Sequence, residues 1–361
     1  MCFDPDISER LARARADLRM GVPIVLDGGT PMLVLAVETL TQDRLAAVHD
    51  LKTDPVIAIT DHRARTLKAH AYDGDLARLS LPREASLDWV RGIADPADDL
   101  RTPMKGPFMA QRGGDSLAHR VSLLLVKSAR LLPAAVLCPL NDPNFAATRD
   151  LTSLPLDQIL PALHTAQPLS PVISARLPLS VSEAGQLHVF RPEDGGEEHY
   201  AVEIGKPDRT QPVLARLHSA CFTGDLLGSL KCDCGPQLRG ALTQMGAEGA
   251  GVLLYLNQEG RGIGLANKMR AYSLQDQGFD TVEANHRLGF EDDERDFRLG
   301  ADILRQMGFT QVRLLTNNPA KIDMMERCQI HVRARVPLKT GQTPQNAGYL
   351  ATKAAKSGHL L

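Results

Sequence analysis

The sequence predicts two α/β domains, and the prediction depends on the length of the chain and on one change in composition. With 361 residues, the chain exceeds what one ordinary hydrophobic core accommodates. The stretch 150–180 holds five prolines between positions 155 and 178, a density that opposes long helices and interior strands and is typical of a boundary. We therefore divide the chain into domains 1–170 and 171–361.

Strand and helix patterns alternate along the second domain. The apolar runs 251–256 and 311–316 have the length of buried strands. Apolar residues at helical spacing predict helices over 236–249 and 295–308, and a further helix is expected over 320–328. The predicted fold class is therefore α/β, with an α+β mixed sheet in the C-terminal domain and a second α/β domain before it.

Composition excludes several classes of protein. The formal charge of −2, the pI near 6.6 and the aromatic content of 4% argue against a nucleic-acid-coating surface or a stacking platform. Six cysteines are too few for a secreted disulfide scaffold. The first twenty residues carry acidic side chains and lack the apolar core of a signal peptide, and no run is long enough to span a bilayer. We expect a soluble cytoplasmic protein with no nucleic-acid or membrane partner.

Half of the cysteines lie in one short stretch. Cys221, Cys232 and Cys234 are spaced Cys-x10-Cys-x-Cys, and His218 precedes them. Clustered thiolates in a reducing compartment indicate zinc. His218 as a fourth ligand would complete a closed structural site, whereas three cysteines and a water would form a catalytic site. The spacing alone fits both.

Three neighbouring motifs bear on that choice. Glu259 and Arg261 lie in a glycine-rich turn after a strand, where backbone N–H groups can face phosphate. The charged run 290–297 and the pair Thr316 and Lys321 follow. Taken singly, each is compatible with an ordinary loop or helix start. Together with three cysteines they predict a zinc hydrolase that acts on a phosphorylated substrate.

These residues carry a resemblance to a known family. The segments "HSACFTGDLLGSLKCDCGPQL", "NQEGRGIGL", "AYSLQDQGFDTVEANHRLGF", "DDERDF" and "LLTNNPAKI" resemble GTP cyclohydrolase II, and the ending "GYLATKAAKSGHLL" is similar to that family's C-terminus. The resemblance covers about 175–361. It implies hydrolysis of GTP to 2,5-diamino-6-ribosylamino-4(3H)-pyrimidinone 5′-phosphate, formate and pyrophosphate, the first step of riboflavin synthesis, by a homodimer.

The resemblance assigns the cysteines to a catalytic metal. Cys221, Cys232 and Cys234 match ligands of one zinc ion per chain, with water in the fourth place, and Tyr272 matches a tyrosine near the opening ring. Purine C8 is electrophilic, so a metal-activated water can attack it. The matching GTP contacts are Arg216, Leu217, His218, Ser219, Gln237, Glu259, Gly260, Arg261, Thr281, Thr316 and Lys321. Ala220 departs from the pattern, because glutamate is common at that position.

Two residues match the site where pyrophosphate leaves. Asp293 and Arg295 correspond to the residues assigned as base and nucleophile at the α-phosphate. A guanidinium is almost always protonated, so a nucleophilic Arg295 needs unusual deprotonation by Asp293, whereas a phosphate clamp does not. The sequence leaves both roles open. Departure of pyrophosphate also implies Mg²⁺ on the triphosphate.

The N-terminal half has a weaker resemblance. Residues 10–140 are faintly similar to 3,4-dihydroxy-2-butanone 4-phosphate synthase, which precedes the cyclohydrolase in many bacterial fusions. The acidic metal-binding loop of the synthase is missing at 27–32, and Gly114, Asp115 and Ser116 replace its His-Thr-Glu stretch. Because Mg²⁺ needs carboxylate oxygens, we expect a degenerate, non-catalytic domain that serves packing or dimerisation, with a regulatory role as the alternative.

Two other functions fit parts of the sequence. One is a paralogue that opens the same purine ring but stops early or serves another pathway, such as pyrimidine breakdown. Ala220 and the altered N-terminal half leave this alternative open, while Tyr272, Asp293 and Arg295 oppose it. The other, from a different class, is an interaction or RNA-binding module with a structural zinc, which the near-neutral charge opposes.

Overall fold

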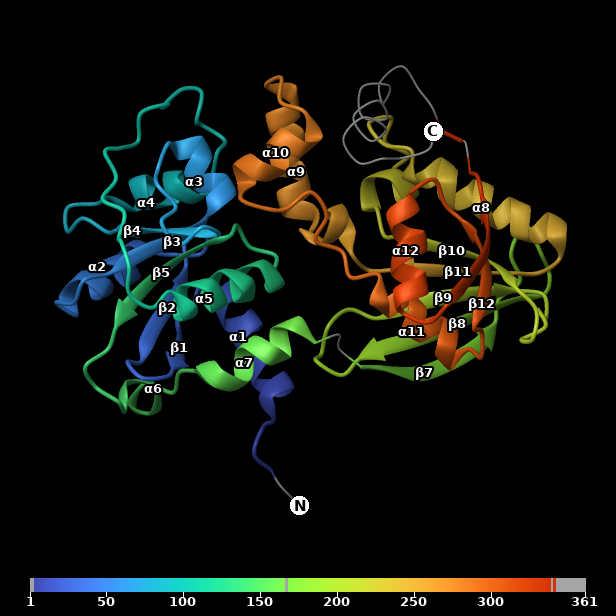
Figure 1. Cartoon of the computed structure of the whole chain (residues 1–361), viewed down its shortest axis with the longest axis horizontal. Helices are drawn as coiled ribbons and strands as arrows, with labels where there is room; N and C mark the ends of the chain where they lie inside the picture. Colours follow the sequence, from blue (N-terminus) through green and yellow to red (C-terminus); the bar gives the residue numbers. More distant parts are fainter. Residues whose placement is uncertain (1–2, 166–167, 339, 342–361) are drawn as a thin grey trace. The chain divides into compact units, whose positions relative to one another are not determined.

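The chain forms two compact units in the computed structural model, which describes residues 3–165, 168–338 and 340–341. The first unit comprises Met1–Thr165 together with Ala266–Glu294, and the second comprises Ala166–Leu265 together with Arg295–Leu361. Figure 1 colours the chain along its sequence and draws the segment 266–294, which belongs to the first unit, in orange.

The first unit contains a mixed sheet in the order β4-β3-β5-β2-β1-β6. Neighbouring strands are antiparallel except for the parallel pair β1 and β6. In sheet order the strands are β4 (Leu76–Ser80), β3 (Val56–Thr60), β5 (Ala134–Pro139), β2 (Met32–Ala36), β1 (Ile24–Asp27) and β6 (Ser153–Pro155). The helices described in this unit are α1 (Ile7–Met20), α2 (Gln42–Asp50), α3 (Asp61–Leu67), α4 (Leu87–Ala94), α5 (Leu117–Ser128), α6 (Phe145–Thr148), α7 (Leu156–His164), α9 (Leu265–Asp276) and α10 (Thr281–Leu288).

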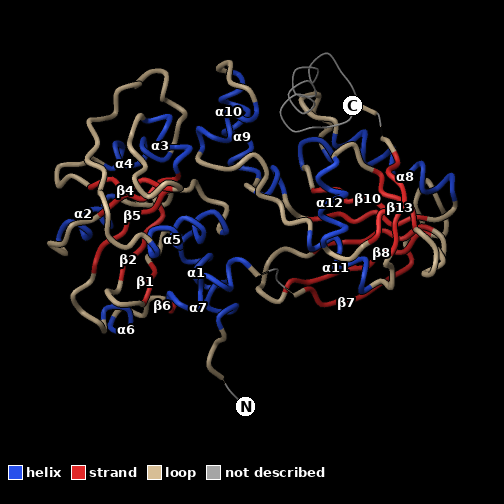
Figure 2. The backbone as a smooth tube through the Cα atoms, viewed as in Figure 1, coloured by secondary structure: helices blue, strands red, loops and turns tan. Residues whose placement is uncertain are grey.

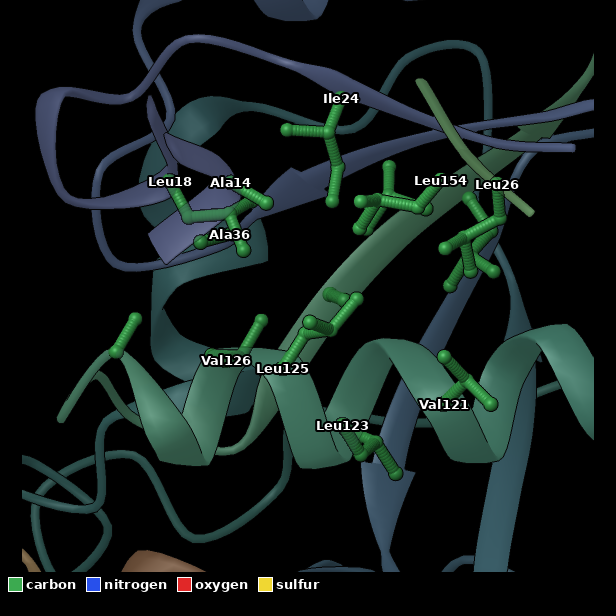
Figure 3. Close-up of a cluster of buried hydrophobic side chains, with 14 of the residues drawn as sticks. Ala14, Leu18, Ile24, Leu26, Ala36, Val121, Leu123, Leu125, Val126 and Leu154 are labelled. Carbon is green, nitrogen blue, oxygen red and sulfur yellow. The ribbon is translucent and has the colours of Figure 1, made fainter. Parts of the chain in front are cut away.

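Local sequence explains where these helices begin and end. Helix α1 starts at a capping box, in which the Asp6 side chain accepts from the Glu9 N–H and the Glu9 side chain accepts from the Asp6 N–H. It ends at Gly21, which adopts the left-handed conformation. The apolar faces of α1, α5 and α7 cover one face of the sheet. Figure 3 shows Leu18, Leu125 and Leu154 in this shared apolar core.

The second unit contains a mixed sheet in the order β13-β12-β10-β11-β9-β8-β7. Strands β13, β12, β10 and β11 run parallel, and the remaining pairs are antiparallel. In sheet order the strands are β13 (His331–Val336), β12 (Gln311–Leu315), β10 (Val213–Ser219), β11 (Gly251–Leu256), β9 (His199–Ile204), β8 (Gly185–Pro192) and β7 (Leu169–Arg176). The helical segments described here are the π-helix η1 (Phe222–Leu226), α8 (Cys234–Glu248), the 3₁₀ turn η2 (Glu259–Gly262), α11 (Arg298–Gln306) and α12 (Pro319–Arg327).

Helices cover both faces of this second sheet, as the tube in Figure 2 shows. Side chains alternate between faces along β10: Val213, Ala215 and Leu217 join one core with residues of α11 and α12, whereas Leu214 joins another with residues of α8. Arg216 has the same parity as Leu214, so it lies on the α8 face. This alternation brings polar residues of β10 towards the first turn of α8.

The fold class predicted from the sequence is confirmed, because both units combine a mixed sheet with helices. Runs 251–256 and 311–316 form β11 and β12, and the expected helices correspond to α8, α11 and α12. The charged run 290–297 lies in the connection before α11, so it is a loop and not a helix start. The C-terminal "GYLATKAAKSGHLL" lies outside the described residues.

The proline-rich stretch contains short elements only. Pro161 lies inside the nine-residue helix α7, and Pro171 lies in β7, which pairs with β8 and forms the edge of its sheet among the described strands. Within the part of the chain that the structure describes, no helix has the length and apolar character needed to cross a membrane.

Candidate metal and nucleotide site

The predicted site residues of the second unit follow the carboxyl ends of three neighbouring parallel strands. Strand β10 lies between β11 and β12 and runs parallel to both. Ser219 ends β10, Glu259 follows β11, and Thr316 follows β12. Because the carboxyl ends of parallel strands meet at one edge of a sheet, the loops after them form a common site.

The three cysteines converge on one point after β10. Cys221 caps η1, Cys232 precedes α8 and Cys234 is its first residue. Their sulfur atoms all lie within 4.8 Å of one another, and those of Cys221 and Cys232 are 3.7 Å apart. Sulfurs bound tetrahedrally to one zinc ion lie about 3.8 Å apart. The thiols therefore fit a single metal ion.

The electrostatics of the cluster favour a cation. Hydrogen bonding with Cys221, together with burial, raises the pKa of both Cys232 and Cys234. The thiols of Cys232 and Cys234 therefore resist ionisation by themselves. A bound cation reverses this balance, because it stabilises the thiolate form of each ligand.

Gly224 makes the close approach of the sulfurs possible. A Cβ atom at this position would lie 2.5 Å from the Cys232 sulfur and 3.1 Å from the Cys221 sulfur. The Gly224 N–H also donates to the Cys221 sulfur, at 3.3 Å. The π-helical turn η1 thus wraps its backbone around the ligands and leaves no room for a side chain.

His218 is engaged by a carboxylate and not by the cysteines. Its Nε2 lies 3.0 Å from the Asp225 carboxylate, which also accepts from the Tyr255 hydroxyl and from the Cys221 N–H, each at 3.0 Å. Burial lowers the pKa of His218, and the bond to Asp225 opposes that shift. Among the described residues, the candidate metal ligands here are the three cysteines only.

Arg216 connects the end of β12 to α8. Its Nη1 donates to the Leu315 carbonyl at 3.2 Å and its Nη2 to Gln237 Oε1 at 2.6 Å. Gln237 in turn donates to Asp233, beside the last two cysteines. Burial lowers the pKa of Arg216 to about 10. The predicted contacts Arg216 and Gln237 are therefore joined, and they adjoin the metal ligands.

The turn after β11 is tied to the metal loop. Glu259 accepts from the Phe222 N–H at 2.6 Å and from the Gly260 N–H at 2.8 Å. Gly260 and Arg261 both have φ values near +60°, namely 64° and 60°. A left-handed arginine is uncommon, and such strain clusters at functional turns.

The other predicted contacts of this unit also lie in this neighbourhood. Arg295 Nη1 donates to Ser219 Oγ at 3.4 Å, and Lys321 Nζ donates to the Leu217 carbonyl at 3.0 Å. Both cations face the ring of Phe297, at 4.7 and 4.9 Å from its centroid. Two positive groups, Arg295 from the loop before α11 and Lys321 from α12, thus contact the end of β10.

Three predicted residues belong to the first unit. Tyr272 lies on α9 with Lys268 Nζ 5.8 Å from its ring centroid, Thr281 begins α10 and accepts from Gln275 at 3.2 Å, and Asp293 lies exposed in the loop after α10. The structure therefore groups the cysteines and most of the GTP contacts in one unit, and these three residues in the other.

Sequence reasoning missed the residues that orient the predicted ones. Asp225 lies between the first two cysteines and fixes His218, Tyr255 supports Asp225, and Asp233 separates the last two cysteines and bonds Gln237. The position of Asp225 inside the cysteine spacing was a usable signal. Tyr255 looked like part of an apolar strand, and nothing local marked it.

Comparison with known proteins identifies the family. The family model for GTP cyclohydrolase II matches residues 170–337. GTP cyclohydrolase-2 of Azospirillum brasilense is 44% identical over 358 residues, which cover 97% of this chain and 93% of that protein. The chain belongs to the GTP cyclohydrolase II family. As a member of this family it is a hydrolase.

Other members of the family match a shorter part of this chain. GTP cyclohydrolase-2 of Azotobacter vinelandii is 58% identical over 175 residues, which cover 48% of this chain and 84% of that protein. Among solved structures, a two-domain 3,4-dihydroxy-2-butanone 4-phosphate synthase from A. baumannii covers 92% of this chain and 99% of its own, with 16% identity and a TM-score of 0.33. A score this low does not establish a shared fold.

Proposed function

We propose that this protein hydrolyses GTP to 2,5-diamino-6-ribosylamino-4(3H)-pyrimidinone 5′-phosphate, formate and pyrophosphate, as the first step of riboflavin biosynthesis. The observation that carries the proposal is the convergence of three thiols at the carboxyl ends of parallel strands, beside Arg216 and Glu259. Membership of the GTP cyclohydrolase II family supports the same reaction.

In this proposal Cys221, Cys232 and Cys234 hold one zinc ion per chain. When bound, zinc supplies Lewis acidity that makes water a nucleophile near neutral pH. His218 stays outside the ligand set because Asp225 holds it. Three protein ligands leave a coordination position open, which is typical of a catalytic site.

The remaining residues bind and orient the substrate. The GTP contacts around the metal loop are Arg216, Leu217, His218, Ser219 and Gln237. Further GTP contacts, at the ends of the neighbouring strands, are Glu259, Gly260, Arg261, Thr316 and Lys321. Thr281 and Tyr272 act from α10 and α9, with Tyr272 beside the opening ring. Arg295 and Lys321 bring positive charge suited to phosphate, with Mg²⁺ on the triphosphate.

We assign Arg295 to a phosphate clamp and Asp293 to an acid–base role at the α-phosphate. The Arg295 guanidinium lies against the Phe297 ring and donates to Ser219, an arrangement that suits a permanent cation. The clamp needs no deprotonated guanidinium, which a nucleophilic role requires.

Residues 171–361 form the cyclohydrolase domain, and 1–170 form a non-catalytic domain derived from a synthase. We propose that the protein acts in the cytoplasm as a homodimer, with GTP as its partner and with neither nucleic acid nor membrane.

A product assay tests this function. The purified protein is incubated with GTP, Zn²⁺ and Mg²⁺, and the pyrimidine, formate and pyrophosphate are measured separately. Equal amounts of all three are expected. Ring-opened product that keeps its formyl group would favour the paralogue, and absence of turnover would contradict the proposal.

A further inference from the structure

The segment Ala266–Glu294 carries Tyr272, Thr281 and Asp293, yet it packs against residues of the N-terminal domain within the first unit. Helix α10 contacts α3, as can be followed in Figure 1. The N-terminal domain therefore touches the part of the chain to which the proposed function assigns chemistry, and the contacts fall into three groups.

The first group is centred on buried Arg63 of α3. Its side chain is 1% exposed, and its guanidinium donates to Asp99 and, at 3.4 Å, to the Arg287 carbonyl at the end of α10. Asp99 also lies 3.7 Å from the Arg287 guanidinium. One buried arginine thus links the fold of the N-terminal domain to the last turn of α10.

The second group holds the start of α9. The Asn267 side chain, fully buried, donates to the Arg130 carbonyl at 3.0 Å. Arg270 bonds both Asn267 and Glu38, at 2.7 and 2.9 Å, and Glu38 accepts from the Leu132 N–H at 2.7 Å. The helix that carries Tyr272 is therefore anchored through Asn267 and Arg270, both of which precede that residue in α9.

The third group holds the loop that carries Asp293. Thr60 Oγ1 donates to the Gly289 carbonyl at 2.9 Å, and His62 Nε2 lies 3.1 Å from Glu291. Gly289 has a φ of +87°, and a Cβ there would lie 2.8 Å from Thr60 Oγ1. Only a glycine allows this close approach.

Lys127 of α5 binds the other end of the loop that carries Asp293. Its Nζ donates to Glu294 Oε1 at 2.6 Å, and that oxygen also accepts from the Glu291 N–H at 3.0 Å. The two side chains are largely buried, with exposures of 16% and 23%. Asp293 lies in the sequence between Glu291 and Glu294, which this hydrogen bond joins. The ion pair of Lys127 with Glu294 therefore restricts the turn that carries Asp293.

We propose that the N-terminal domain is a positioning domain for the cyclohydrolase reaction, and that Lys127, through Glu294, holds the loop carrying Asp293. The role of Asp293 rests on the proposed function, whereas the holding of the loop rests on the contacts above. Lys127 acts through its neighbours and is not itself a catalytic residue. Preorganisation of this kind acts mainly on turnover, because a slightly misplaced group loses transition-state contacts.

Helix α5 offers a matched pair of variants. Lys127→Met removes the ion pair to Glu294, and Arg120→Met removes an ion pair of the same helix, to Asp75, at 2.6 Å. Both changes delete one positive charge and its ion pair with a carboxylate. Lys127→Met also removes the contact of Lys127 with the Phe290 ring of the same loop, 5.9 Å from Nζ to the ring centroid. Arg120 bonds within the N-terminal domain and does not contact the 266–294 segment through that pair, so it controls for charge and for general loosening.

The experiment uses the full chain and two measurements. In Lys127→Met, hydrogen exchange of peptides covering 289–297 should rise, and kcat for formate and pyrophosphate release should fall by about three- to tenfold with KM for GTP little changed. Lys127→Arg should restore most of both, and Arg120→Met should match the wild type in both.

Three results would overturn the inference: unchanged exchange in Lys127→Met, unchanged kcat in an active enzyme, or equal effects in Arg120→Met. A wild-type protein that releases no formate from GTP would contradict the proposed function instead. The exchange comparison needs no turnover, so it still decides whether Lys127 holds the loop.

Discussion

His218 Nε2 lies 3.0 Å from each carboxylate oxygen of Asp225, and Asp225 also accepts from the N–H of the first cysteine, Cys221. The histidine is thus tied to the metal loop without joining the sulfur cluster. One carboxylate sets both the orientation of the imidazole and the backbone of a proposed ligand. This arrangement separates metal binding from the function of His218.

Replacement of His218 by alanine should therefore leave the zinc content at one ion per chain. The imidazole contacts Asp225, and among the described residues the candidate ligand group consists of cysteines. Metal analysis of purified His218→Ala checks this. Loss of zinc from this variant, with the fold retained, would indicate a Cys3His structural site.

Cys232→Ser should lose zinc and ring opening while keeping most of the fold. An open three-cysteine site is not a folding nucleus for a unit that has two apolar cores on its sheet. Cys328→Ser is the matched control, because Cys328 lies at the end of α12, outside the cluster. Zinc content, circular dichroism and formate release are measured on both. Failure of Cys232→Ser to fold would favour structural zinc.

Arg295→Ala should reduce pyrophosphate release by about 10²–10³, the usual effect of losing one charge-assisted contact in a transition state. Arg295→Lys should retain a measurable rate, because a point charge still binds phosphate. Single-turnover kinetics with pyrophosphate detection measures both. A covalent guanylyl-enzyme trapped in the wild type, with Arg295→Lys inactive, would establish the nucleophilic role.

The first unit should lose stability as the pH falls from about 6.5 to about 4. Burial lowers the pKa of His119 from 6.5 to about 4, and within the described chain neither ring nitrogen has a hydrogen-bond partner. The unfolded state therefore binds the proton first, and a shift of this size weakens folding by about 3 kcal/mol below pH 4.

Thermal unfolding of wild type and His119→Leu between pH 7 and pH 4 measures this effect. The variant should lose less stability on acidification than the wild type does. His70→Leu, which replaces an exposed histidine of the same unit, should retain the wild-type dependence. Parallel curves for wild type and His119→Leu would show that His119 does not carry the effect.

The N-terminal domain should not convert ribulose 5-phosphate to 3,4-dihydroxy-2-butanone 4-phosphate. Strand β1 ends at Asp27, and Gly28 and Gly29 follow it, so this turn lacks the clustered carboxylates that Mg²⁺ needs. Product analysis with ribulose 5-phosphate and Mg²⁺ checks this. Growth of a synthase-deficient strain on this chain would contradict it.

The sequence predicted the elements whose signals are local. Strand β11 is a continuous apolar run, and α12 begins at Pro319 directly after its N-cap Asn318, a pair that marks a helix start. The cysteine spacing likewise indicated the metal site. Each of these features is read within a few residues, where propensity and capping act directly.

The sequence did not predict the contacts between distant residues. Lys127 and Glu294 are separated by 167 positions, and no local pattern pairs one lysine with one glutamate among many. The packing of α10 on α3 has the same origin. The order of the motifs along the chain predicted that 266–294 belongs to the domain 171–361. The packing of this segment in the first unit depends instead on buried side chains such as Arg63 and Asn267.

The discontinuity of the first unit has a consequence for synthesis in the cell. Its final helices leave the ribosome only after the strands β7 to β11 of the second unit have been made. Domains usually fold in the order in which they leave the ribosome. Here the first unit cannot be completed, and its surface around Arg63 and Thr60 stays uncovered, until residue 294 has been made. Cutting the gene at the proline-rich stretch would place that surface and the segment that covers it on two different chains.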